Sequence, residues 1–78
     1  MKGNILVVDD EKTMRKSLEE ILRLEGYQVE AVGDGKAAME ALDDGKYDLM
    51  LLDLKMPGVG GLEVLKYAAE NAPTCKVI

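Results

Sequence analysis

The feature that most limits the fold of this chain is a regular alternation between short strand-like runs and longer segments with helical periodicity. The strand-like runs are rich in β-branched and apolar residues, as strands buried on both faces are. Four runs are predicted as strands: Asn4–Val8, Tyr27–Val32, Asp48–Leu52 and Lys76–Ile78. Strands that alternate with helices pair in parallel through right-handed crossovers, so the pattern predicts an α/β fold with an open parallel sheet.

Between these runs lie segments in which apolar residues recur at the spacing of an amphipathic helix. The predicted helices are, in order, Lys12–Glu25, a short helix that Gly45 ends, and a helix that lies between Gly61 and Pro73. Gly26 follows the first helix directly and is predicted to be its C-terminal cap. Each predicted helix therefore connects one predicted strand to the next.

Length and charge limit the class of protein further. The chain has 78 residues, which is enough for one domain and one core. Its 15 acidic and 10 scattered basic residues do not form the positive surface that nucleic acids require. The longest apolar runs have four residues, far below the ~20 of a membrane-spanning helix, and Cys75 has no disulfide partner. We therefore expect a cytoplasmic protein that binds neither nucleic acid nor membrane directly through this segment.

Aspartates follow two of the predicted strands at the points where these strands end. Asp9 and Asp10 come directly after the first strand, and Asp53 comes directly after the third. In an open parallel sheet, ligands bind beyond the carboxyl ends of the strands, where the strand order reverses. If the first and third strands are neighbours, three carboxylates meet there and repel one another unless a cation compensates them. Oxygen ligands suit Mg²⁺, so the pattern predicts a magnesium site.

Two motifs resemble the receiver domains of bacterial response regulators. The run ILVVDD from Ile5 to Asp10 resembles the first strand and acidic pair of that family. The run LLDLKMPGVGG from Leu51 to Gly61 resembles its phosphoacceptor strand and the loop that follows. The separation of the motifs also agrees, and the resemblance covers the whole chain. It implies one receiver domain over residues 1–78, with a flavodoxin-like sheet of strand order 2-1-3-4.

The resemblance also implies a role for each site residue. Asp53 would accept a phosphoryl group from a phosphohistidine of a sensor histidine kinase. Asp10 would bind Mg²⁺ directly, Asp9 largely through water, and the backbone carbonyl of Lys55 would be a further ligand of the ion that Asp53 contacts. Such an ion reduces the repulsion between a carboxylate and a phosphoryl group. The module is expected to control an output domain, often in transcription regulation, and not to be an enzyme.

Other patterns indicate different functions. The run from Asp9 to Thr13 is close to the D-x-D-x-T motif of Mg²⁺-dependent phosphohydrolases with an aspartate nucleophile. Glu11 replaces the second aspartate of that motif, however, and Asp53 has no role in it. The run from Gly33 to Ala38 matches a dinucleotide-binding fingerprint, but it follows the second strand, and a two-glycine turn explains it. The phosphohydrolase interpretation stays as the alternative.

Single residues near the predicted site carry further expectations. Pro57 is expected to stiffen the loop before the third helix, and Gly60 and Gly61 to adopt backbone conformations that side chains forbid. Met14 is expected to be partly buried because of its helical spacing. Cys75 is expected to be a small residue that enters a strand, and not a redox switch.

The family pattern continues beyond Ile78 with a Ser or Thr, a Lys, a fifth strand and two more helices. The resemblance therefore implies a C-terminally truncated receiver domain that is defective in switching. Apolar side chains of the first and third strands would meet water on the face that keeps a single helix, and the fourth strand would be an open edge. We expect a homodimer or higher assembly that covers this face.

Overall fold

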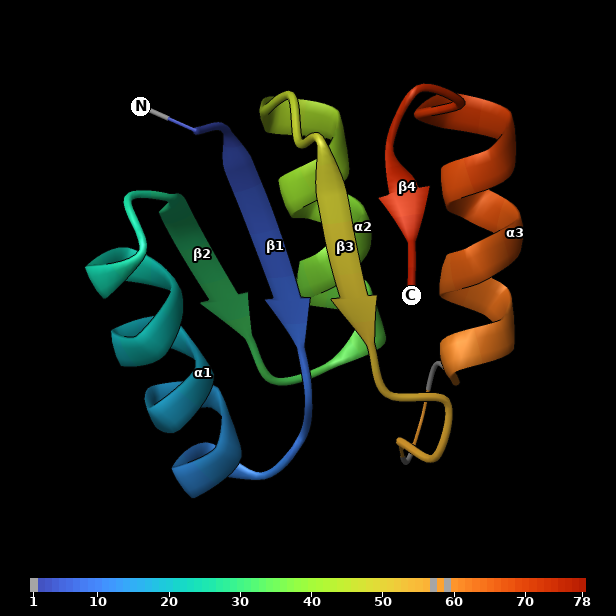
Figure 1. Ribbon diagram of the computed structural model, residues 1–78. Coiled ribbons are helices and arrows are strands. Elements are labelled where there is room, and N and C mark those ends of the chain that lie inside the picture. The colour runs from blue at the N-terminus through green and yellow to red at the C-terminus, as the bar shows by residue number, and fades with distance from the viewer. Residues whose placement is uncertain (1, 57, 59) are drawn as a thin grey trace.

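The computed structural model describes residues 2–56, 58 and 60–78, which form an α/β sheet with strands and helices in alternation (Figure 1). The strands are β1 (Asn4–Val8), β2 (Gln28–Val32), β3 (Leu49–Leu52) and β4 (Lys76–Val77). The helices are α1 (Lys12–Leu24), α2 (Gly35–Asp44) and α3 (Gly61–Asn71). Each predicted strand agrees with the observed one to within one residue at either end. The predicted fold class is therefore confirmed.

The strands pair in parallel in the order β2-β1-β3-β4, which is the predicted flavodoxin-like order. Val8, the last residue of β1, lies opposite Val32 of β2 and Leu52 of β3. The three strands therefore end at the same level, and all the arrows in Figure 1 point to one edge of the sheet. The strand order reverses beside β1, which places a ligand-binding crevice at this edge.

The helices divide between the two faces of the sheet as right-handed crossovers require. On one face, Leu18 and Leu22 of α1 pack against a small cluster made of Ile5, Val7 and Val29. On the other face, α2 and α3 cover the larger cluster (Figure 1). Its buried members are Leu6, Val8, Ala38, Leu42, Met50, Met56, Val64, Ala68 and Cys75. Consecutive residues of β1 are thus buried on opposite faces, because successive strand side chains alternate.

Two expectations about the α1 face are wrong in part. Ile5 and Val7 of β1 are 2% and 1% exposed, although they were predicted to meet water. They are buried because β1 is a central strand and α1 lies across it. Met14, predicted to be partly buried, is 44% exposed. On the same face of β3, Leu49 and Leu51 are only half-buried. The prediction of apolar side chains in contact with water therefore holds for β3 and not for β1.

Helix α1 ends at the predicted glycine. Gly26 has a φ of +100°, a left-handed conformation that side chains disfavour. Its N–H donates to the carbonyl of Arg23 at 3.0 Å, and the N–H of Tyr27 donates to the carbonyl of Leu22 at 3.1 Å. This is the Schellman arrangement, which turns the chain directly into β2.

No helix in the described ranges is long and apolar enough to cross a membrane.

Strand β4 forms the open edge that the sequence predicts. The N–H groups of Lys76 and Ile78 donate to the β3 side, to the carbonyls of Asp48 and Met50 at 3.0 and 2.9 Å. Because backbone groups alternate along a strand, those of Val77 point away from β3.

Cys75, which precedes β4, is buried, and burial together with the negative charge of Asp48 raises the pKa of its thiol. A raised thiol pKa lowers the fraction of reactive thiolate.

Candidate metal centre

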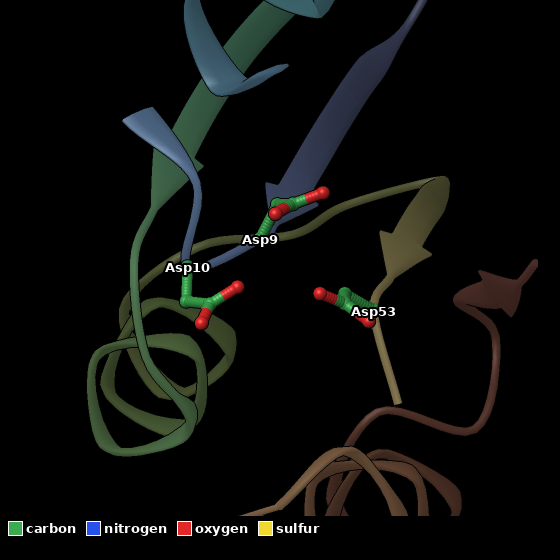
Figure 2. Close-up of side chains that lie close together, drawn as sticks. All are labelled: Asp9, Asp10 and Asp53. Carbon is green, nitrogen blue, oxygen red and sulfur yellow. The ribbon is translucent and has the colours of Figure 1, made fainter. Parts of the chain in front are cut away.

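The three acidic residues that the sequence places at strand ends lie together at the carboxyl edge of the sheet (Figure 2). Asp9, Asp10 and Asp53 each offer one carboxylate oxygen, and these oxygens lie within 4.8 Å of one another. The pairing of β1 with β3 causes this approach, because it brings the ends of the two strands side by side. In Figure 2, the carboxylates of Asp10 and Asp53 point toward each other across the gap between the strand ends.

Backbone groups hold two of these carboxylates in place. Oδ1 of Asp9 accepts a hydrogen bond from the N–H of Glu11 at 2.9 Å. Oδ1 of Asp53 accepts one from the N–H of Lys55, also at 2.9 Å. The backbone N–H of Asp53 donates to the carbonyl of Val8 at 2.9 Å, which ties the end of β3 to β1. One oxygen of each side chain is therefore oriented, and the other is available to a ligand.

The electrostatics of the cluster favour a bound cation. Asp9 and Asp53 are half-buried and Asp10 is exposed. Over the described part of the chain, no lysine or arginine forms an ion pair with them, and Arg23 pairs instead with Glu19 on α1. Carboxylates at this distance repel one another. Hard oxygen ligands with one side open to water are the donor set of Mg²⁺, so the residues present fit this ion.

The loop after β3 bears on two further predictions. The structure shows the backbone N–H of Lys55 bound to Asp53, whereas a metal-binding role for the carbonyl of Lys55 stays a prediction. Pro57, predicted to stiffen this loop, lies outside the described residues. Gly58 has a φ of +75°, a left-handed conformation that side chains disfavour. Among the described residues of this loop, it is the position that requires a glycine for its backbone conformation.

Gly60 and Gly61 do not adopt the backbone conformations that were predicted for them, namely ones that side chains forbid. Gly60 has a φ of −77°, which any residue adopts, and Gly61 begins α3 without a positive φ. A Cβ on Gly61 would instead clash with the Cα of Leu54 and lie 2.7 Å from the carbonyl oxygen of Asp53. Gly61 thus lets the start of α3 approach the backbone that carries Asp53, and spacing alone could not reveal this close contact.

The variant Gly61→Ala is expected to lower the free energy of unfolding by about 1–3 kcal/mol, the usual cost of forcing extra volume into a packed site. The clash is with backbone atoms, which cannot rotate away as a side chain can. Gly60→Ala is the matched control, because a Cβ there meets no atom within 4 Å. Urea unfolding of both variants measures the difference, and equal stability would contradict the close approach.

Local structure also explains the glycine-rich run that matches a nucleotide-binding fingerprint. Oδ1 of Asp34 accepts a hydrogen bond from the N–H of Ala37 at 2.8 Å, so Asp34 is the N-cap of α2. Gly35 is buried in the first turn of that helix. The run is therefore a strand-to-helix turn with a side-chain cap, as the two-glycine interpretation predicts.

The strand order and the acidic cluster beside the reversal point define a flavodoxin-like α/β domain whose acidic cluster fits a divalent cation. Comparison with known families agrees with this class. The model of the response regulator receiver domain matches residues 5–78. The chain therefore belongs to the receiver domains of two-component response regulators.

Several relatives have informative descriptions. The DNA-binding response regulator MtrA of Mycolicibacterium smegmatis is 41% identical over 66 residues, which are 85% of this chain and 29% of MtrA. The crystal structure of the response regulator TrrA from Thermotoga maritima in complex with Mg²⁺-BeF has a TM-score of 0.88 and 40% identity. A structure of the histidine kinase ThkA in complex with TrrA has a TM-score of 0.87 and 40% identity. Both matches cover 95% of this chain and 64% of the other.

Proposed function

We propose that this chain is the phosphoacceptor module of its response regulator and that a sensor histidine kinase phosphorylates Asp53 in the presence of Mg²⁺. The observation that carries the proposal is the position of Asp53. One of its oxygens is held by a backbone N–H, and it shares a cluster within 4.8 Å with two other aspartates. The structures of the similar protein TrrA in complex with Mg²⁺-BeF and with the histidine kinase ThkA support the proposal.

The proposed reaction is a single transfer. The free oxygen of Asp53 attacks the phosphorus of a phosphohistidine, an O–P bond forms, and the P–N bond breaks. The electron pair of the P–N bond returns to the imidazole, which is left neutral once its protons rebalance with water. Asp9 and Asp10 would hold Mg²⁺, which when bound supplies positive charge to the phosphoryl oxygens. The chain accepts one phosphoryl group and is proposed to act as an acceptor, not as an enzyme with turnover.

The proposal extends to the protein of which such a module forms a part. MtrA is described as a DNA-binding response regulator, and this chain spans 29% of its length. By analogy, phosphorylation of Asp53 would control a linked output domain that acts in transcription. A cytoplasmic location belongs to the same proposal, since the free thiol of Cys75 suits a reducing compartment.

We also propose that two copies of the chain associate through the poorly covered part of the α1 face. Leu18, Leu51 and Ile78 line a hollow at the edge of this face, and the acidic residues Asp9, Asp10 and Asp53 line the same hollow. Ile78 is 73% exposed, and Ile21 on the outer side of α1 is 58% exposed. A second copy that covered these side chains would bury apolar area now in contact with water.

Ile78→Glu is expected to shift the chain from dimer or higher assembly toward monomer, because it places a charge in the proposed contact. Leu62→Glu on α3 is the matched control, since Leu62 is 65% exposed on the opposite face. Light scattering at micromolar concentration measures the mass of each variant. A monomeric unsubstituted chain, or equal dissociation by both variants, would argue against association through the α1 face.

A further inference from the structure

The side chain of Arg15 folds back from α1 onto the turn that carries the acidic pair. Its Nη1 donates a hydrogen bond to the backbone carbonyl of Asp9 at 2.8 Å, in a half-buried position. The backbone N–H of Arg15 donates to the carbonyl of Glu11 at 3.0 Å in the first turn of the helix. Main chain and side chain of one residue therefore both bind the segment between β1 and α1.

The bond from Arg15 completes the set of contacts that hold Asp9. The N–H of Asp9 donates to the carbonyl of Val32 at 3.2 Å, and Oδ1 of Asp9 accepts from the N–H of Glu11 at 2.9 Å. The carbonyl that Arg15 binds belongs to the peptide group between Asp9 and Asp10. A peptide group is planar, so holding its oxygen also sets the direction in which the chain enters Asp10.

Asp10 depends on this backbone control more than its neighbours do. Its carboxylate accepts no hydrogen bond from the described residues, whereas those of Asp9 and Asp53 each accept one from a backbone N–H. It nevertheless points toward Asp53 (Figure 2). With no hydrogen-bond partner among the described residues, the carboxylate of Asp10 depends on the adjoining peptide groups for the direction of its Cα–Cβ bond.

Gly33, at the end of β2, provides the space in which the guanidinium group lies. A Cβ on Gly33 would be 2.8 Å from Nη1 of Arg15 and 3.2 Å from its Cζ. Gly33 is not among the glycines with positive φ, so its backbone conformation does not require a glycine. A side chain at position 33 would displace the guanidinium group of Arg15. The turn pattern in the sequence does not predict this requirement for a glycine.

We infer that Arg15 is a positioning residue of the metal centre, and that it orients Asp9 and Asp10 for Mg²⁺ through the peptide that joins them, in a space that Gly33 leaves open. The inference rests on the proposed magnesium site. Arg15 would act through the backbone carbonyl of Asp9 and is not itself one of the predicted ligands of the ion. Residues that orient metal ligands in this way commonly change metal affinity by about 10–100-fold when they are replaced.

The sign of the effect separates this role from simple electrostatics. Arg15 carries a positive charge near a site that attracts a cation, so removing the charge alone would strengthen Mg²⁺ binding. Losing the orientation of Asp9 and Asp10 would weaken it. The two explanations therefore predict opposite changes for the same substitution.

The test is calorimetric titration of the chain with Mg²⁺. We expect Arg15→Met to weaken binding by about tenfold and Arg15→Lys, which keeps a donor and the charge, to restore part of the affinity. Lys16→Met removes the same charge from an exposed neighbouring position and is expected to leave binding unchanged or slightly tighter. Binding by Arg15→Met as tight as by Lys16→Met would overturn the inference.

Gly33→Ala provides a second test that keeps the charge of Arg15. It is expected to weaken Mg²⁺ binding several-fold, by an amount within the range typical of such supporting residues. In the Arg15→Met background the same substitution should have no effect, because no guanidinium is left to displace. Fully additive effects of the two substitutions would overturn the inference. This cycle remains decisive if either single variant loses stability, because thermal unfolding in EDTA gives the folded fraction for each.

Hydrogen exchange of the metal-free chain distinguishes failure of this inference from failure of the proposed function. The amide of Glu11 is bonded to Asp9, so Arg15→Met is expected to speed its exchange in EDTA while Lys16→Met does not. If the unsubstituted chain bound no Mg²⁺, the proposed function would fail, yet this exchange would still report on Arg15. Unchanged exchange would count against Arg15 alone.

Discussion

Replacing Asp53 with asparagine is expected to abolish phosphorylation of the chain. The amide keeps the shape of the side chain and an oxygen that can accept the hydrogen bond from Lys55, so the fold around it should persist. It lacks the anionic oxygen that attacks phosphorus. The measurement is intact-mass spectrometry after incubation with Mg²⁺ and acetyl phosphate, a small phosphodonor that bypasses the unidentified kinase. The unsubstituted chain should gain the mass of one phosphoryl group and Asp53→Asn should gain none.

Two further variants make this result specific. Glu40→Gln, on the exposed side of α2, also converts a carboxylate to an amide and is expected to leave phosphorylation intact. Asp9→Asn addresses the phosphohydrolase alternative, in which Asp9 is the nucleophile and turnover of a phosphate ester is lost with it. Phosphorylation that survives in Asp53→Asn would refute the assignment of Asp53. Sustained ester hydrolysis that only Asp9→Asn abolishes would favour the alternative.

Replacing Asp10 with asparagine is expected to weaken Mg²⁺ binding by roughly thirtyfold. Two unit charges ~4 Å apart in water interact by about 1 kcal/mol, so a dication that loses one carboxylate loses about 2 kcal/mol. The metal-free chain should change in the opposite direction. Its melting temperature in EDTA should rise, because one of the three mutually repelling carboxylates within 4.8 Å is gone.

Calorimetry with Mg²⁺ and thermal unfolding in EDTA measure the two effects of Asp10→Asn separately. Glu40→Gln is again the control, since it removes one negative charge from an exposed position of α2 that is not part of the cluster. It should leave the Mg²⁺ affinity within about twofold, because exposed charges beyond a Debye length of ~10 Å are largely screened. A lower melting temperature of metal-free Asp10→Asn would show that the cluster is not repulsive as inferred from its geometry.

Much of the fold follows from local patterns in the sequence. The runs that form β1 and β3 are continuous and apolar, and parallel strands buried on both faces require such runs. Gly26 marks the end of α1 because a left-handed residue is needed there. These patterns act within a single segment, where periodicity and backbone conformation are sufficient to identify an element. The elements implied beyond Ile78 remain a prediction from the resemblance.

The sequence by itself determined that Asp9, Asp10 and Asp53 stand at the carboxyl ends of buried strands, because Asp9 and Asp53 directly follow the last apolar residue of their runs and Asp10 comes next after Asp9. Tertiary structure alone decided how near they come, since that distance depends on β1 pairing with β3. The need for Gly61 and the reach of Arg15 also became visible only in the folded chain. Such contacts join segments that are separate in sequence, and packing, not local preference, brings them together.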